Sequence, residues 1–125
     1  MKERAAGLAI DGTSATMLLL DAEDGTVLAP PELYNAAQPP AAVEYVRSIA
    51  PADHTTIAAT SSLCKVVAWH QRGLWQAAVA AGRTPVVLDH ASWVASLLHG
   101  ERRASDYNNL LKLGYDPGLE VYPDW

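Results

Sequence analysis

Two kinds of hydrophobic pattern alternate along the chain. Short apolar runs bounded by turn residues predict strands, and apolar residues that recur every three or four positions predict helices. The sequence predicts strands at 6–10, 16–20 and 85–88, and a hairpin at 24–25 that leads into 26–28. It predicts helices at 41–49, 61–73, 74–81, 90–99 and 107–113. Because strands and helices alternate, the pattern predicts an α/β fold.

Polar residues and glycines mark where several of these helices begin and end. Ser61 and Asp106 are predicted caps, because a side-chain oxygen there accepts a hydrogen bond from a free amide of the first turn. Gly73, Gly100 and Gly114 are predicted stops. Three or four strands are few for a complete layered sheet, so we expect this sheet to be part of a larger one.

Composition narrows the class of protein. The 125 residues are enough for one domain with a core, and half of them are apolar. A net charge of −5 argues against nucleic-acid and anionic-membrane partners. The single cysteine, Cys64, excludes an internal disulfide and is expected to be a small buried side chain. With no apolar run of membrane-spanning length, and with Asp11 interrupting the first apolar stretch, the sequence predicts a cytoplasmic protein.

Few residues are arranged for chemistry. The four histidines lie far apart in sequence and no ligand set completes any of them, so no metal site is expected. The sequence contains neither a nucleophile elbow nor a P-loop nor a dinucleotide fingerprint, and no catalytic residue is predicted. The string I-D-G-T-S at 10–14 remains. It is either a plain polar turn or a group of ligand-binding residues at the end of a strand, where open α/β sheets bind ligands.

Five segments, taken together, resemble the FGGY-type carbohydrate kinases, and most closely the D-ribulose kinase (xylulose-kinase-like) branch. The resemblance covers nearly the whole chain in the family's order, and S-D-Y-N-N-L-L-K-L-G-Y-D is its most specific string. The segments are 9-AIDGTSATMLLLDAEDGTVL-28, 31-PELYNAA-37, 50-APADHTTIAATSSLCKVVAWHQ-71, 89-DHASWVASLLHG-100 and 105-SDYNNLLKLGYDP-117.

The resemblance implies a fold and a place for this chain within it. Family members have two domains of the ribonuclease-H-like (actin-like ATPase) fold, with the sugar between them and ATP with Mg²⁺ held mainly by the second domain. Residues 1–125 align with part of the N-terminal, sugar-binding domain, after the family's own phosphate hairpin. The chain is therefore expected to lack the first strands of that sheet, the ATP-binding domain and the catalytic Asp. Neither ATP nor Mg²⁺ is expected to bind it alone.

The resemblance also assigns site residues. Ser14 is expected to exchange a hydrogen bond with a sugar hydroxyl, while Asp11 and Thr13 shape the turn beside it. The pair Tyr34-Asn35 is expected near the pocket wall. Lys65 is expected to be a solvated helix residue and not a phosphate ligand.

Three hypotheses for function stay open at this point. The first is a part of a kinase that transfers phosphate from ATP to a ketopentose such as D-ribulose, inactive alone. The second is a stand-alone, non-catalytic sugar-binding or interaction module, in which an unpaired sheet edge beside 7–10 would favour strand-mediated self-association. The third is an independent ATP-binding protein that uses residues 11–14 as a phosphate clamp, in which Ser14→Ala would abolish ATP binding.

Overall fold

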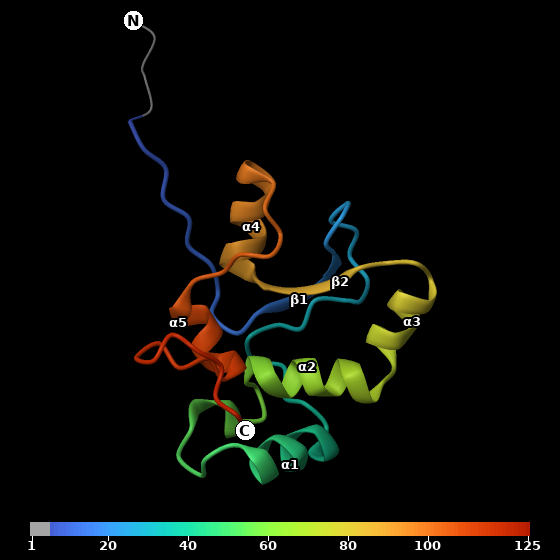
Figure 1. Cartoon of the computed structure of the whole chain (residues 1–125), viewed down its shortest axis with the longest axis vertical. Helices are drawn as coiled ribbons and strands as arrows, with labels where there is room; N and C mark the ends of the chain where they lie inside the picture. The colour runs from blue at the N-terminus through green and yellow to red at the C-terminus, as the bar shows by residue number, and fades with distance from the viewer. Residues whose placement is uncertain (1–5) are drawn as a thin grey trace, which may run out of the picture.

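The computed structural model describes residues 6–125 and has a mixed α/β fold (Figure 1). The elements follow one another as β1 (Met17–Asp21), α1 (Pro40–Ile49), η1 (Thr55–Ile57), α2 (Ser62–Gln71), α3 (Leu74–Ala80), β2 (Pro85–Asp89), α4 (His90–His99), α5 (Tyr107–Leu110) and η2 (Leu111–Leu113), where η marks a 3₁₀ turn. The α/β prediction is confirmed.

Strands β1 and β2 form an antiparallel pair, in register from Met17 opposite Asp89 to Asp21 opposite Pro85. On its other side β1 meets only single bridges, from Leu20 to Val27 and from Met17 to residue 32. The predicted strands at 16–20 and 85–88 are therefore confirmed to within one residue. The predicted hairpin into 26–28 is reduced to one bridge.

The strand predicted at 6–10 is wrong. These residues form no strand, residues 6–9 are exposed, and the Leu8 side chain is 76% exposed. An apolar run becomes a strand only where another backbone segment pairs with it. No backbone segment of the described chain forms a ladder or a bridge with residues 6–10.

All five predicted helices form, and local signals set their ends. Ser61 Oγ accepts a hydrogen bond from the Cys64 amide at 3.2 Å, as expected of a cap. Asp106 Oδ1 accepts from the amides of residues 108 and 109 at 2.9 and 3.1 Å, so its capping role is confirmed. Gly100 and Gly114 end their helices with φ of 82° and 99°, in the left-handed region that favours glycine. The helix expected at 107–113 divides into α5 and the 3₁₀ turn η2.

The sheet lies between α4 on one side and α2 on the other, with α1 beyond α2 (Figure 1). Every residue of β1 is buried because both faces of the strand are covered. Met17 and Leu19 pack with Trp69 of α2, whereas Leu18 and Leu20 pack with β2 and α4. This burial fixes the position of β1, and so of the D-G-T-S turn that precedes it.

A third cluster joins α1 to α2 through Val43, Val46 and Cys64. Cys64 is fully buried, as expected of a small apolar side chain. In the described part of the chain, no helix combines the length and the apolar character that crossing a membrane requires.

Candidate functional site

The D-G-T-S turn, residues 11–14, rests on the beginning of α4. Gly12 lies so close to Ala91 that a Cβ on Gly12 would stand 2.6 Å from the Ala91 amide nitrogen and 2.8 Å from its Cα. No other residue fits here without a shift of the backbone. The glycine of the motif therefore serves a close approach between the turn and α4.

Hydrogen bonds hold the turn in a defined shape. The Gly12 amide donates to Asp11 Oδ1 at 2.8 Å, and the Thr13 amide donates to His90 Nδ1 at 3.1 Å. The second bond requires the Nδ1 atom to carry no proton. The turn closes with a bond from the Thr16 amide to the Thr13 carbonyl at 3.2 Å. The side chains of Asp11, Thr13 and Ser14 are left at the surface.

Behind the turn, Ala15 adopts a left-handed backbone conformation with φ of 64°, which is costly for a residue with a Cβ. The side chain of Lys65 reaches this point from α2. Its Nζ donates to the Ala15 carbonyl at 2.6 Å and to the Thr60 carbonyl at 3.0 Å. A charged donor thus holds the strained residue in place.

The expectation that Lys65 is solvated is wrong, because its side chain is fully buried. Burial lowers the pKa of this ammonium group, and the negative charge of Glu32 acts in the opposite direction. The sequence shows that Lys65 lies in a predicted helix, but it does not show what the side chain contacts. The carbonyl it holds lies 50 residues earlier, and no local pattern could have revealed that.

A hollow of about 420 Å³ opens beside the turn. Its lining is mostly apolar and aromatic: Thr13, Thr16, Leu18, Val27, Pro31, Leu33, Tyr34, His90 and Trp93. The rings of His90 and Trp93 stack with centroids 6.4 Å apart and planes 24° apart. Thr16 Oγ1 accepts a hydrogen bond from the Tyr34 amide at 3.0 Å, which joins the opposite wall to the start of β1.

The predicted site residues are divided by this geometry. Thr13 and Tyr34 line the same hollow, whereas Asp11 and Ser14 sit on the exposed turn beside it. The sequence missed His90 and Trp93. His90 follows directly after β2, at a strand end of the kind that supplies ligand-binding residues, and Trp93 lies three positions further along α4, on the same helix face.

A buried carboxylate secures the start of α4 from the other side. Asp89 Oδ1 accepts from the Ser92 amide at 2.9 Å, and Asp89 Oδ2 accepts from the hydroxyls of Ser92 and Ser105, each at 2.5 Å. This network ties α4 to the segment that precedes α5. It fixes the helix on which His90 and Trp93 stand.

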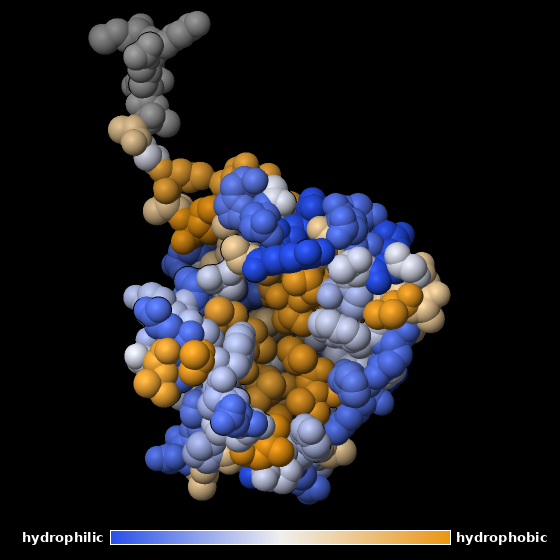
Figure 2. Space-filling view, in the orientation of Figure 1, coloured by the Kyte–Doolittle hydropathy of each residue, from blue (hydrophilic) through white to orange (hydrophobic). Residues whose placement is uncertain are grey.

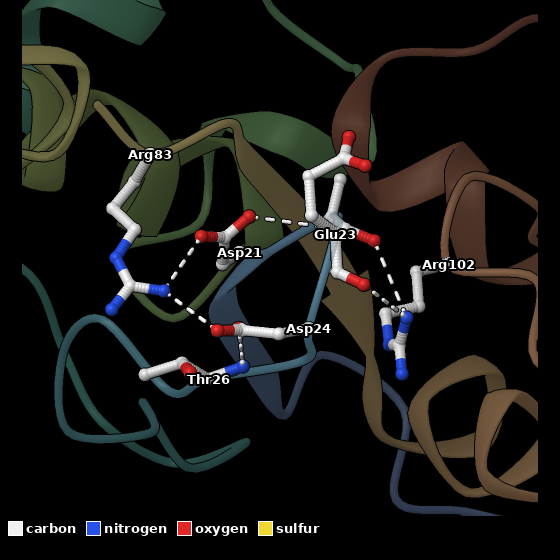
Figure 3. A network of polar contacts seen from close by, with 7 residues as sticks. Asp21, Glu23, Asp24, Thr26, Arg83 and Arg102 are labelled. Atoms are coloured by element: carbon white, nitrogen blue, oxygen red, sulfur yellow. Dashed lines mark hydrogen bonds and ion pairs between the residues drawn. The ribbon is translucent and has the colours of Figure 1, made fainter.

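A second polar network closes the turn after β1 (Figure 3). Arg83 Nη1 donates to Asp21 at 3.0 Å and to Asp24 at 2.7 Å. Hydrogen bonds from Thr26, and then from Arg83, lower the pKa of Asp24 to about 2. A backbone hydrogen bond from Glu23 lowers the pKa of Asp21, with a further contribution from Arg83. The network joins the end of β1 to the start of β2.

Arg102 strengthens the same turn from the opposite side. Its Nη1 donates to the Glu23 carbonyl at 3.2 Å, as Figure 3 shows. None of these charged groups lines the hollow beside the D-G-T-S turn. Their arrangement stabilises the scaffold, and no Asp, Glu, Lys or Arg side chain lines the hollow.

The D-G-T-S turn does not fit a nucleotide phosphate. The amides of Gly12 and Thr13 are already engaged within the chain, and the Asp11 carboxylate stands next to them. A phosphate would have to displace both bonds and lie against a like charge. Among residues 6–125, no three His, Cys, Asp or Glu side chains are grouped as a metal ion would need. No model of a known protein family matches the sequence.

Proposed function

We propose that this chain forms part of the sugar-binding domain of an ATP-dependent carbohydrate kinase of the FGGY type, and that the hollow beside Thr13 takes a ketopentose such as D-ribulose. We also propose that its α/β fold is part of a ribonuclease-H-like domain. The sheet covered by helices on both faces, together with the resemblance in sequence, supports this assignment.

The observation that carries the proposal is the composition of the hollow. Small-molecule sites are concave, range from about 300 to 1,000 Å³, and combine apolar and aromatic walls with a few polar groups. The hollow has about 420 Å³, aromatic walls at Tyr34 and Trp93, and a polar edge at Thr13 and Thr16. A sugar has apolar C–H faces and a rim of hydroxyls, and this distribution matches such walls.

The turn supplies the groups that would orient the sugar. The hydroxyls of Thr13 and Ser14 can donate or accept, and the Asp11 carboxylate accepts. All three side chains are exposed at the edge of the hollow and stand on a turn held by Gly12 and Lys65. Ser14 and Asp11 lie outside the lining itself, so their contacts would be made at its mouth.

Phosphoryl transfer requires an acceptor hydroxyl in line with the phosphate, Mg²⁺ on the phosphates and a base. When bound, ATP supplies the phosphoryl group. The turn does not fit its phosphates, so the role we propose for this chain is to bind and orient the acceptor. Binding of an acceptor without the catalytic groups accelerates nothing, and the chain alone should be inactive.

Calorimetric titration of the 125-residue chain with D-ribulose, and separately with ATP and Mg²⁺, tests this function. We expect saturable binding of the ketopentose that Ser14→Ala weakens by about three- to tenfold, the usual effect of one lost hydrogen bond. Ser48→Ala is the matched control, because Ser48 is an exposed serine of α1 far from the turn in sequence.

Two results would contradict the proposal. One is ATP binding that Ser14→Ala abolishes, which would favour a phosphate clamp. The other is ATP-dependent phosphorylation of the ketopentose by this chain alone. A third result would favour the stand-alone module. In that case the chain is stable and monodisperse and binds the sugar, but it shows no kinase activity even when the remainder of a kinase is supplied.

A further inference from the structure

A second apolar hollow, of about 450 Å³, runs beside β2 between α2 and α5. Its floor consists of Leu63, Val66, Val86, Val87, Leu110 and Leu113. Figure 2 shows apolar surface in the middle of this face, surrounded by hydrophilic residues. Large apolar patches with polar rims mark sites of association. We call this hollow the β2 groove.

The backbone along the β2 groove is unpaired. In the antiparallel pair, His90 N bonds to Thr16 O and Ala22 N bonds to Thr84 O, so the even-numbered residues of β2 face β1. The N–H and C=O of Val87 therefore point away from β1, toward the groove side. No backbone hydrogen bond within residues 6–125 satisfies them. An edge of this kind accepts another strand.

The chain also contains a segment whose backbone lacks a strand partner within residues 6–125. Residues 6–10 are apolar, residues 6–9 are exposed and Ile10 is half-buried, and the backbone of the segment has no strand partner within the described chain. In an extended conformation the side chains of Leu8, Ala6 and Ile10 would point to one face of the segment. Gly7 and Ala9 would lie on the other face. Such a segment can place a large side chain in the groove and leave only small ones outside.

The segment does not occupy the groove of its own chain. Ile10 lines a different hollow with Ala91 and His99 of α4, and the segment leaves the body beside α4 (Figure 1). A second copy of the chain can supply a strand partner for this segment and a strand for the β2 edge. Since the described part of each chain (residues 6–125) has both a segment without a strand partner and an unpaired β2 edge, two copies can satisfy both reciprocally, and the assembly closes with twofold symmetry.

Charge agrees with this pairing. The chain carries a net charge of −5, which opposes self-association in general. Residues 6–10 and the floor of the groove are uncharged, however, and Arg103 lies on its rim. Asp11, the residue directly after the segment, and Arg103, whose guanidinium group pairs with Glu23 at 3.1 Å, carry opposite charges.

We propose that the chain forms a closed homodimer in which residues 6–10 of each copy add as a strand to the β2 edge of the other and place Leu8 in the β2 groove. This inference does not depend on sugar binding. The full chain should show a reversible monomer–dimer equilibrium in sedimentation velocity.

Two variants test the interface without disturbing the monomer. Leu8→Lys should weaken dimerisation at least about tenfold, because a charge would replace a buried apolar side chain. Ala9→Pro should weaken it similarly, because proline lacks the N–H and breaks strand pairing. Leu97→Lys is the control: Leu97 is 64% exposed on α4 and lies outside the groove. All three variants should melt at the temperature of the parent monomer.

Amide hydrogen exchange supplies a second readout. The Val87 amide should exchange more slowly in the dimer than at concentrations where the chain is monomeric. A chain that stays monomeric at all concentrations would overturn the proposal. So would open-ended aggregation, a dimer that Leu8→Lys and Leu97→Lys weaken equally, or a dimer in which exchange at Val87 is unchanged.

Discussion

Replacing Lys65 with methionine removes the buried ammonium group behind the D-G-T-S turn and keeps an unbranched apolar side chain of similar length. The Ala15 carbonyl loses the donor 2.6 Å away, and the Thr60 carbonyl loses the donor 3.0 Å away. The strained backbone at Ala15 loses the bond that holds it. We therefore expect Lys65→Met to destabilise the fold.

The magnitude follows from these contacts. An unsatisfied buried carbonyl costs about 1–3 kcal/mol. Ala15 is buried, whereas Thr60 is half-buried and can recover a bond to water. The folded variant also avoids the free-energy cost of removing a charged ammonium group from water, which offsets part of this loss. The net loss should be about 2 kcal/mol, and at about 4 °C per kcal/mol for a domain of this size, Tm should fall by about 8 °C.

Thermal and urea unfolding followed by circular dichroism measure this loss. The matched control is Lys112→Met, because Lys112 lies half-buried on η2 and holds no part of the turn. The control should stay within about 0.5 kcal/mol of the parent. Equal stability of the Lys65→Met and Lys112→Met chains would refute the structural role assigned to Lys65.

The pH dependence gives an independent check on the same residue. Burial lowers the pKa of Lys65 below its ordinary value of 10.5, so the unfolded chain binds this proton more tightly than the folded chain. Between the two pKa values the stability contributed by Lys65 must rise with pH. The difference in unfolding free energy between the parent and Lys65→Met should therefore increase as the pH approaches 10.5. A difference that shrinks over this range would contradict the burial of the ammonium group.

Two further predictions concern the turns on either side of β1. Gly12→Ala should cost about 1–3 kcal/mol, because its Cβ would meet the Ala91 backbone, whereas Gly7→Ala, which meets nothing within 4 Å, should be close to neutral in the same melts. Arg83→Gln should raise the pKa of Asp24 from about 2 toward 3.8, as measured by NMR titration of the carboxyl group. In the parent chain, Asp24 should contribute stability above about pH 4 that is lost as the pH falls through 2, and Arg83→Gln should narrow that window.

The helices could be predicted because their signals are local. The cap at Ser61 lies three residues from the amide it serves, and the stop at Gly100 needs only its own backbone conformation. Asp106 likewise acts on the first turn of its own helix. These positions depend on neighbours within one turn, which the sequence displays directly.

The strands were less predictable because each requires a partner. β1 and β2 lie more than 60 residues apart in sequence. Both predicted strands form because the fold brings them together as a pair. Residues 6–10 have an equally apolar pattern and no partner in the described chain, so they form no strand. Hydrophobic pattern reports the tendency to be buried, whereas strand formation also depends on pairing.

The site was predicted only in part for the same reason. A motif indicated Thr13, and the resemblance indicated Tyr34. The aromatic pair His90–Trp93 reaches the turn only through the fold, since Thr13 and His90 lie 77 residues apart. The burial of Lys65 is not predictable from the sequence, because lysine side chains are rarely buried. Only the position of Ala15, 50 residues away, explains its burial.

The central claim is that the hollow beside the D-G-T-S turn binds a ketopentose. Titration of the isotopically labelled chain with D-ribulose, followed by NMR amide shifts, tests it most directly. We expect saturable shifts centred on Thr13, Tyr34 and Trp93, with Ser14 at their edge, and a weaker response in Ser14→Ala. The absence of saturable shifts at the three lining residues, or shifts centred instead on the hollow between Ile10 and α4, would contradict the claim.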